Sequence, residues 1–269
     1  MRTLSPIGRR VVAVSGVEEV GAYTVISALD SEGPRDPQPG QFYMLSSEDR
    51  WGGGSDERPF LPRAFSFARI RPDGTLDFML EAIGPGTTRL AELQPGDGLG
   101  LLGPLGIGFD VEGFAGRPLL VGGGIGAAPL VALQDELGPG ARVLLGFRSA
   151  AHAEAAGLFF ASDPAVVTDD GSVGRQAFVT ELLREELDTD PDATVFACGP
   201  PPMLEAVRAL CAERGVPAQL ALESGMACGY GACFGCVVPT RDGYVRLCVD
   251  GPVLDAGELA TALIAGTGH

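Results

Sequence analysis

Four cysteines stand close together near the end of the chain, at Cys228, Cys233, Cys236 and Cys248. Their spacing, C-x4-C-x2-C-x11-C, suits a [2Fe–2S] cluster, because a short loop can present three thiolates and a separate segment the fourth. Glycines within the loop would let the backbone pass close to the cluster and aim N–H groups at its sulfurs. An Asp242-Gly243 pair between apolar runs favours a hairpin that returns Cys248 to Cys236.

Two other uses of these thiols compete with the cluster. Structural zinc sites more often use two C-x2-C pairs, and only one is present, at Cys233 and Cys236. Disulfides are disfavoured because no secretory signal peptide is visible, and a chain of 269 residues can bury a core without cross-links. The spacing therefore favours a cluster and leaves zinc as the alternative.

Length and composition indicate a soluble globular protein of about two domains with room for a small third. Hydrophobic residues make up 45% of the chain and charged residues 20%. No uninterrupted apolar run reaches about 18 residues, so we expect no membrane span. The net charge of −16 argues against binding to nucleic acid or to an anionic membrane surface. Together with the missing signal peptide, this composition predicts a cytoplasmic protein.

The first hundred residues carry short strand patterns, such as Val11–Val14 and Ala22–Ser27, which predict a small antiparallel barrel or sandwich. Within them, Arg63-Ala64-Phe65-Ser66 could do chemistry. The arginine can bind a diphosphate in forked geometry, the aromatic ring can lie along a flavin, and the serine can hydrogen-bond it. Taken alone, the motif is weak, because an arginine and a phenylalanine on one strand are more often a surface arginine beside a core.

Two further segments of this part are ambiguous. Gly86 and Thr87 stand where a glycine turn meets a capped helix start, which is either an anion site or an ordinary turn. The segment from Ser46 to Pro62 contains three consecutive glycines and charged residues, and we expect it to be a flexible surface loop that only connects its neighbours.

The pattern then changes to alternating strands and helices, which predicts an open parallel sheet with crossover helices. We expect strands at Arg142–Phe147, Ala165–Thr168 and Ala193–Cys198, and helices over 154–161 and 176–187. A strand at Arg117–Val121 leads into Gly122-Gly-Gly-Ile-Gly126 and an apolar helix, the unit that binds a nucleotide diphosphate at a helix N-terminus. Another strand ends in Cys198-Gly-Pro200. Ligands of such sheets lie at the carboxyl ends of the strands, so both segments are candidates.

Two side chains near those strand ends have open roles. Cys198 is either a small apolar residue or a contact for a nicotinamide ring. Arg148 follows a strand and could bind a 2′-phosphate, so NADP is possible beside NAD. Neither His152 nor His269 has a partner pattern, and no G-x-S-x-G or H-E-x-x-H motif is present, so we expect neither histidine-based nor hydrolytic catalysis.

The order of these motifs is similar to that of the ferredoxin–NADP reductase superfamily. More closely, it resembles the electron-transfer subunits of class 1B dihydroorotate dehydrogenases, over nearly the whole chain. The resemblance is carried by Arg63 to Ser66, Gly86-Thr87, Gly122 to Pro129, Asp169 to Ser172, Cys198 to Pro200, Glu223 to Cys236, and Cys248 to Val253.

The resemblance implies an α+β multidomain chain: an antiparallel β-barrel flavin domain at 1–108, an α/β parallel-sheet nucleotide domain at 109–217 and a small β-rich iron–sulfur domain at 218–269. It implies three sets of site residues. They are Arg63, Ala64, Phe65, Ser66, Met79, Leu80, Glu81, Gly86 and Thr87 for FAD; Gly123, Gly124, Ile125, Gly126, Cys198, Gly199 and Pro200 for NAD; and Cys228, Cys233, Cys236 and Cys248 for the [2Fe–2S] cluster.

The resemblance also implies a partner and a pathway. Electrons would pass from dihydroorotate through an FMN-containing catalytic subunit, the cluster and FAD to NAD, in pyrimidine biosynthesis. Two copies of each subunit would form a heterotetramer. A flavin is chemically required between nicotinamide and cluster, because hydride carries two electrons and the cluster accepts one.

Two departures and two alternatives accompany this interpretation. Ala64 replaces the proline usual after the arginine, and the Ser46–Pro62 loop is longer than usual. The same module could serve another partner, as in a ferredoxin–NADP transhydrogenase or a sulfide dehydrogenase. The alternative of another class is a zinc-binding scaffold without redox activity.

Overall fold

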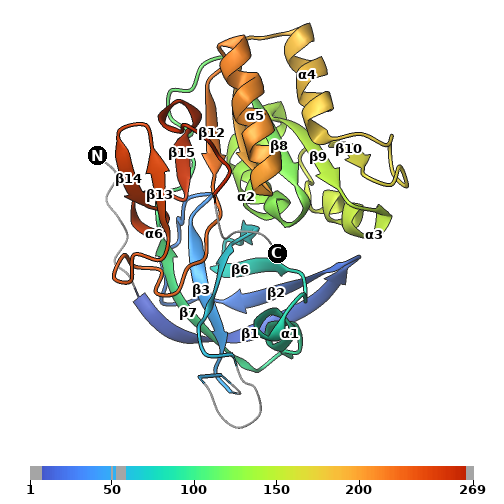
Figure 1. Cartoon of the computed structure of the whole chain (residues 1–269). Coiled ribbons are helices and arrows are strands. Elements are labelled where there is room, and N and C mark those ends of the chain that lie inside the picture. The colour runs from blue at the N-terminus through green and yellow to red at the C-terminus, as the bar shows by residue number, and fades with distance from the viewer. Residues whose placement is uncertain (1–7, 50, 53–58, 265–269) are drawn as a thin grey trace.

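A curved antiparallel sheet, here called the barrel sheet, forms the N-terminal part of the computed structural model, which describes residues 8–49, 51–52 and 59–264 (Figure 1). Its strand order is β4-β3-β7-β1-β2-β6-β5. The predicted strands at Val11–Val14 and Ala22–Ser27 lie within the first two, and the antiparallel barrel class is confirmed. The elements are β1 (Gly8–Val20), β2 (Tyr23–Leu29), β3 (Phe42–Ser47), β4 (Arg63–Ser66), β5 (Arg69–Ile70), β6 (Thr75–Leu80), α1 (Pro85–Ala91) and β7 (Gly98–Leu105).

A second sheet, the parallel sheet, has the order β10-β9-β8-β11-β12-β15, with only β15 antiparallel to its neighbour. Every residue of β11 is buried, as expected for an apolar strand covered on both faces by helices. Its strands are β8 (Arg117–Gly123), β9 (Arg142–Phe147), β10 (Ala165–Thr168), β11 (Ala193–Cys198), β12 (Ala218–Ala221) and β15 (Val253–Asp255). Its α-helices are α2 (Ala127–Leu137), α3 (Ala150–Ala153), α4 (Val179–Thr189) and α5 (Pro201–Arg214), joined by 3-10 turns η1 (Gly124–Gly126), η2 (Gly138–Gly140) and η3 (Glu154–Leu158).

Two helices differ from the pattern in the sequence. A helix expected over 154–161 is instead α3 followed by η3, because the chain turns into helical conformation directly after Ser149, whose hydroxyl bonds His152 Nδ1 at 2.9 Å. A helix expected from Gln176 begins only at Val179. There the Phe178 N–H donates to the Glu181 carboxylate at 3.0 Å, which fixes the helix start.

The four cysteines lie in a small unit inserted between β12 and β15, here called the cysteine lobe (residues 222–252). It contains the cysteine loop, β13 (Val237–Thr240), β14 (Gly243–Arg246) and α6 (Leu247–Asp250). Because β12 and β15 are strands of the parallel sheet, that sheet takes in segments on both sides of the lobe. The domain ranges 1–108, 109–217 and 218–269 stay predictions. The turn η4 (Ala256–Glu258) follows β15, and no helix in the described ranges could cross a membrane.

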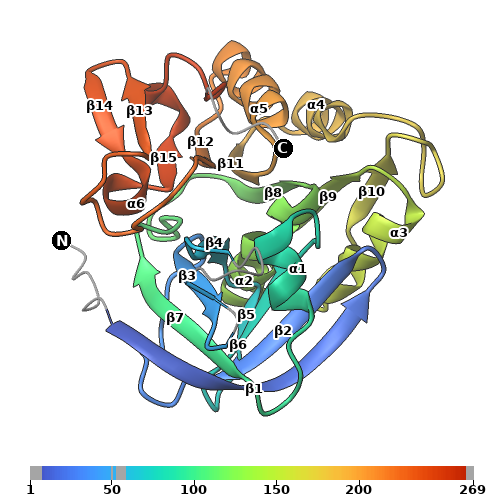
Figure 2. The same ribbon diagram turned by 60° about the horizontal axis from the view of Figure 1, so that its bottom comes forward.

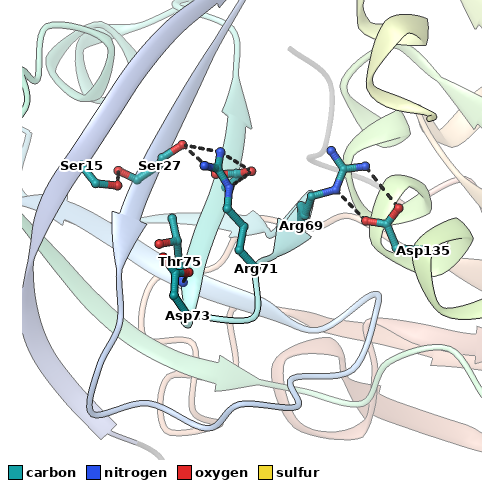
Figure 3. A network of polar contacts seen from close by, with 8 residues as sticks. Ser15, Ser27, Arg69, Arg71, Asp73, Thr75 and Asp135 are labelled. Carbon is teal, nitrogen blue, oxygen red and sulfur yellow. Dashed lines mark hydrogen bonds and ion pairs between the residues drawn. The ribbon is translucent and has the colours of Figure 1, made fainter. Parts of the chain in front are cut away.

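A forked ion pair joins strand β5 of the barrel sheet to helix α2 (Figure 3). Arg69 of β5 donates from Nε and a terminal nitrogen to the Asp135 carboxylate of α2, at 2.6 and 3.2 Å. It also donates to the Leu158 carbonyl at 2.9 Å and lies 4.5 Å from the ring centre of Phe160. The neighbouring Arg71 stays within the barrel sheet. Arg69 is thus the side chain that fastens the barrel sheet to the helix after the glycine turn.

One apolar core continues from the parallel sheet through the cysteine lobe into the barrel sheet. It contains Val121 of β8, Cys236 and Cys248 of the lobe, and Met44 and Leu105 of the barrel sheet. The lobe is therefore packed as part of the main core, and its position relative to both sheets is set by close side-chain contact.

The segment after η4 is fixed to α5 by a single carboxylate. Glu205 accepts hydrogen bonds from the Ala262 N–H at 2.6 Å and the Thr261 hydroxyl at 3.0 Å. Arg208 grips the same carboxylate in forked geometry, at 3.0 and 2.7 Å. The bonds from Arg208, with those from Ala262 and Thr261, lower the pKa of Glu205 from 4.5 to about 2.

Glu205→Gln is expected to destabilise the protein in a pH-dependent way. Because the pKa is lower in the folded state, the contribution is fully present above pH 4.5 and is lost as pH falls towards 2. Since the side chain is 24% exposed, solvent screening reduces the loss at pH 7 to about 2 kcal/mol. Urea unfolding between pH 3 and 7 measures it. Glu213→Gln, on the same helix and 64% exposed, is the control. An equal loss of stability in this control, or a loss in Glu205→Gln that does not change with pH, would contradict the assignment.

Candidate functional site

The four cysteine sulfurs lie in two neighbouring pairs. The predicted hairpin is present as β13 and β14, and it brings Cys248 back so that its sulfur is 3.2 Å from that of Cys236. In the loop, the Cys233 N–H donates to the Cys228 sulfur at 3.4 Å. Two pairs of thiols suit a [2Fe–2S] cluster, in which each of two irons takes two protein sulfurs.

The electrostatics of the two pairs differ. Burial opposes ionisation of Cys228, but the N–H groups of Cys233 and Tyr230 outweigh it and lower the thiol pKa to about 6. Burial, together with the contact with Cys236, raises the pKa of Cys248 to about 12. Two thiolates this close repel each other, so a cationic metal is what would allow both to ionise.

The loop backbone is shaped to surround the sulfurs. Gly229 and Gly231 have φ of +80° and +84°, and Phe234 is left-handed at 59°. The Gly235 N–H donates to the Cys233 sulfur at 3.4 Å, as expected for a loop that aims N–H groups at cluster ligands. Within the described ranges, no three His, Cys, Asp or Glu side chains converge to hold one metal ion. The donor set, four thiols in pairs with N–H groups around them, fits the cluster.

The Arg63–Ser66 motif forms β4, at the end of the barrel sheet nearest the cysteine lobe (Figure 2). The Arg63 guanidinium lies against the backbone of Gly86, where an added Cβ would be 2.5 Å from its Nε. It also donates to the Leu61 carbonyl at 2.6 Å. The Thr87 hydroxyl accepts the Gly84 N–H at 3.1 Å and so starts α1. The Arg63 guanidinium therefore lies beside the start of α1, and together they could bind a diphosphate.

Strand alternation separates the other side chains of this motif. Phe65 projects on the same face as Arg63, and Ala64 and Ser66 project on the opposite face. Trp51 lies 6.0 Å from the Arg63 guanidinium, so this part of the predicted flexible loop packs on the site. Residues 50 and 53–58 of that loop lie outside the described residues.

Among the three predicted FAD contacts Met79, Leu80 and Glu81, only Glu81 has a side chain that is not buried in the core. Met79 and Leu80 are 1% and 0% exposed, so they can offer a ligand only main-chain groups. Glu81 directly follows β6 and faces the parallel-sheet domain, with Oε1 3.8 Å from Arg148 and 3.5 Å from His152 Nε2. Arg148, expected near a 2′-phosphate, therefore lies beside a carboxylate of the other unit.

Sequence reasoning missed the partners of His152. Its ring packs edge-on to Tyr23 of β2, with ring centres 5.6 Å apart, and the Ala22 N–H donates to the Ala151 carbonyl at 2.9 Å. Burial and the Glu81 carboxylate raise the pKa of Tyr23. Tyr23, Glu81 and His152 are far apart in the chain, and no local motif marks them. They meet only because the β1–β2 hairpin docks on α3.

The glycine turn after β8 interlocks with the segment after β11. The two strands are parallel neighbours, and an added Cβ at Gly126 would lie 2.5 Å from the Cys198 carbonyl oxygen. At Gly123 it would lie 2.5 Å from Met203 Sδ and 3.0 Å from Pro200 Cδ. The predicted residues Gly123, Gly124, Ile125, Gly126, Cys198, Gly199 and Pro200 are thus together at the carboxyl edge of the sheet.

Cys198 itself packs as an apolar side chain. It is 6% exposed and belongs to the core between α2 and the sheet. Burial, and then the nearby Glu223 carboxylate, raise the pKa of its thiol well above the ordinary value. The thiol is neutral at physiological pH, and its contact with a nicotinamide ring stays a prediction.

Solved structures share this fold over most of the chain. The structure of an NADH-dependent reduced ferredoxin–NADP oxidoreductase aligns with a TM-score of 0.79 at 23% identity, covering 94% of this chain and 91% of that chain. A ferredoxin NADP+ reductase from Neisseria gonorrhoeae aligns with a TM-score of 0.59 at 18% identity, over 77% and 92% of the chains. The fold is that of the ferredoxin–NADP reductase class, extended by a cysteine lobe.

Sequence relatives define the family more narrowly. Residues 223–260 match the iron–sulfur cluster binding domain of dihydroorotate dehydrogenase B. The electron transfer subunit of dihydroorotate dehydrogenase B (NAD(+)) from Clostridium acetobutylicum is 34% identical, over 87% of this chain and 91% of that protein. The one from Geobacillus thermodenitrificans is 40% identical, over 82% and 86%. The chain belongs to the family of dihydroorotate dehydrogenase B electron transfer subunits, which confirms the resemblance seen in the sequence.

Gly126→Ala is expected to destabilise the protein by about 2 kcal/mol, because the new Cβ meets main-chain atoms of Cys198 and Gly199 that cannot move without shifting a strand. Urea unfolding measures the change. Gly157→Ala in η3 is the matched control, since its added Cβ has no described heavy atom within 4 Å. Equal stability of the two variants would contradict the close approach.

Proposed function

We propose that this chain carries electrons between an FMN-containing subunit that oxidises dihydroorotate and NAD, through a [2Fe–2S] cluster and FAD. The observation that carries the proposal is the arrangement of four thiols in two pairs, on a lobe packed against the sheet that holds Arg63. Family membership supports the same function, since the relatives are named as electron transfer subunits of the NAD(+) enzyme.

Each cofactor has a set of residues that fits it. Arg63 and the start of α1, at Gly86 and Thr87, would hold the FAD diphosphate, with Phe65, on the same face of β4 as Arg63, beside the ring. FAD bound there supplies the conversion between a two-electron hydride and single electrons. The main chain at Gly123–Gly126 and Cys198–Pro200 would hold NAD at the sheet edge.

An exposed aromatic rim on the cysteine lobe would meet the catalytic partner. Tyr230, Phe234 and Tyr244 are 52%, 63% and 78% exposed, and Arg246 lies 5.4 Å from the Phe234 ring centre. Tyrosine, phenylalanine and arginine are enriched in protein interfaces, and Tyr230 and Phe234 belong to the loop that would carry the cluster. We expect a heterotetramer of two chains of each kind. The free thiols are compatible with a cytoplasmic location.

The test of the function uses Cys233→Ser in the complex with the FMN subunit. The wild-type chain is expected to bind about one flavin and two irons and to pass electrons from dihydroorotate to NAD+. The variant should lose most iron and this overall reaction, because one thiolate ligand is gone. It should keep reduction of FAD by NADH, which does not pass through the lobe. Iron analysis, visible spectra and stopped-flow flavin bleaching measure the three quantities.

Three outcomes would contradict the proposal. A colourless protein that contains zinc would support a non-redox scaffold. Loss of flavin reduction by NADH in a folded Cys233→Ser variant would refute the order of cofactors. A complex that accepts electrons from reduced ferredoxin but not from the dihydroorotate-oxidising subunit would support the alternative, a complex like the NADH-dependent reduced ferredoxin–NADP oxidoreductase whose structure aligns with this chain at a TM-score of 0.79.

Tyr244→Ala is expected to weaken binding of the FMN subunit about tenfold, or about 1.4 kcal/mol, because a large exposed aromatic side chain that becomes buried in an interface contributes strongly. Titration calorimetry of the two subunits measures the dissociation constant. Phe178→Ala is the matched control, since Phe178 is 70% exposed but belongs to the start of α4. If both variants weaken binding of the FMN subunit equally, the aromatic rim is not the docking surface.

A further inference from the structure

The cysteine loop touches the barrel sheet at Gly229. An added Cβ at Gly229 would lie 2.6 Å from Met44 Cγ, 3.0 Å from Met44 Sδ and 3.0 Å from Leu105 Cδ1. Gly229 is the residue directly after Cys228, and its φ of +80° is one that side chains rarely adopt. Only a glycine backbone can therefore bring the first cysteine this near to β3.

The segment that carries the fourth cysteine is held against the same end of the sheet. Three residues beyond Cys248, the Gly251 carbonyl accepts a hydrogen bond from the Ile107 N–H, and the Val253 N–H donates to the Ile107 carbonyl at 3.4 Å. Ile107 and Pro252 also form a parallel bridge. Both cysteine-bearing segments are thus docked beside the C-terminal end of β7 (Figure 2).

Met44 connects this contact to the strand proposed to hold the flavin. It is 1% exposed, and Leu105 is 3% exposed, so the contact contains no water-accessible gap. In the ladder between β3 and β4, Met44 lies directly opposite Ala64, and opposite residues of a ladder project on the same face. Gly229, the neighbour of Cys228, thus touches Met44, and Met44 lies on the face of β4 that carries Ala64 and Ser66, opposite to Arg63 and Phe65.

We propose that the Gly229–Met44 contact is the positioning contact across which single electrons pass between cluster and flavin. The inference rests on the proposed function and deepens it. Each crossing moves one electron and no atom, so one centre is oxidised by one electron as the other is reduced by one. A hydride from NADH would bring two electrons and one proton to FAD; two single-electron transfers to clusters would then return the flavin to its oxidised state, with that one proton passing to solvent.

The experiment follows the isolated holoprotein after mixing with NADH. Flavin bleaching in stopped flow reports hydride transfer, and the paramagnetic signal of the reduced cluster after rapid freezing reports the crossing. Met44→Ala opens a gap beside Gly229 and should slow cluster reduction severalfold while flavin bleaching keeps its rate. Met44→Leu restores volume and should recover most of the rate. Leu101→Ala, equally buried but facing the other core of the barrel sheet, should change neither.

A second readout does not depend on turnover. Amide hydrogen exchange of residues 226–235 should rise in Met44→Ala, because the loop loses its contact with β3, and should stay unchanged in Leu101→Ala. If Met44→Ala fails to fold, Leu105→Val removes one methylene from the same contact.

The possible outcomes distinguish a failure of the Gly229–Met44 contact from a failure of the proposed electron-transfer function. Wild-type rates of cluster reduction in a Met44→Ala protein with full iron and flavin would overturn the positioning role and leave the proposed function standing. A wild-type chain without iron or flavin would overturn both. A slowed crossing with normal hydride transfer, recovered by Met44→Leu, supports the contact.

Discussion

Close approach of chain segments at glycines is the constraint on which this structure depends. Redox groups exchange electrons only when they are held near each other, and side chains at the contact points would keep these segments apart. At Gly86 the chain leaves room for the Arg63 guanidinium, at Gly126 for the Cys198 main chain, and at Gly229 for Met44. The three expected binding regions are each built around one such glycine. The Arg69–Asp135 fork then fastens the barrel sheet to the parallel-sheet domain.

The parts that the sequence predicts well are those with a local cause. The strands Arg142–Phe147, Ala165–Thr168 and Ala193–Cys198 match their predicted ranges, because short apolar runs between turn residues form buried parallel strands. The pairing of Cys236 with Cys248 was predictable for the same kind of reason. An Asp-Gly turn with apolar flanks folds the two strands back on each other without help from the rest of the chain.

The parts that the sequence could not predict depend on contacts between distant segments. Met44 reads as an ordinary core residue, and only the packing of a loop 185 positions later gives it a place beside Cys228. His152 showed no partner pattern, yet it lies against Tyr23 and Glu81, because docking of the first hairpin is a tertiary event. The membership of β12 and β15 in one sheet was likewise hidden, since 31 residues, from 222 to 252, separate them.

The insertion of the cysteine lobe has a consequence for how the protein is made. When β12 leaves the ribosome, its outer edge carries unpaired N–H and C=O groups that could recruit another chain. Only β15 covers that edge, and it emerges after all four cysteines have been synthesised. A chain that stops early, or whose lobe fails to fold back, keeps an open edge that chaperones and proteases can recognise. The parallel sheet therefore receives its last strand, β15, only after the four cysteines have been synthesised.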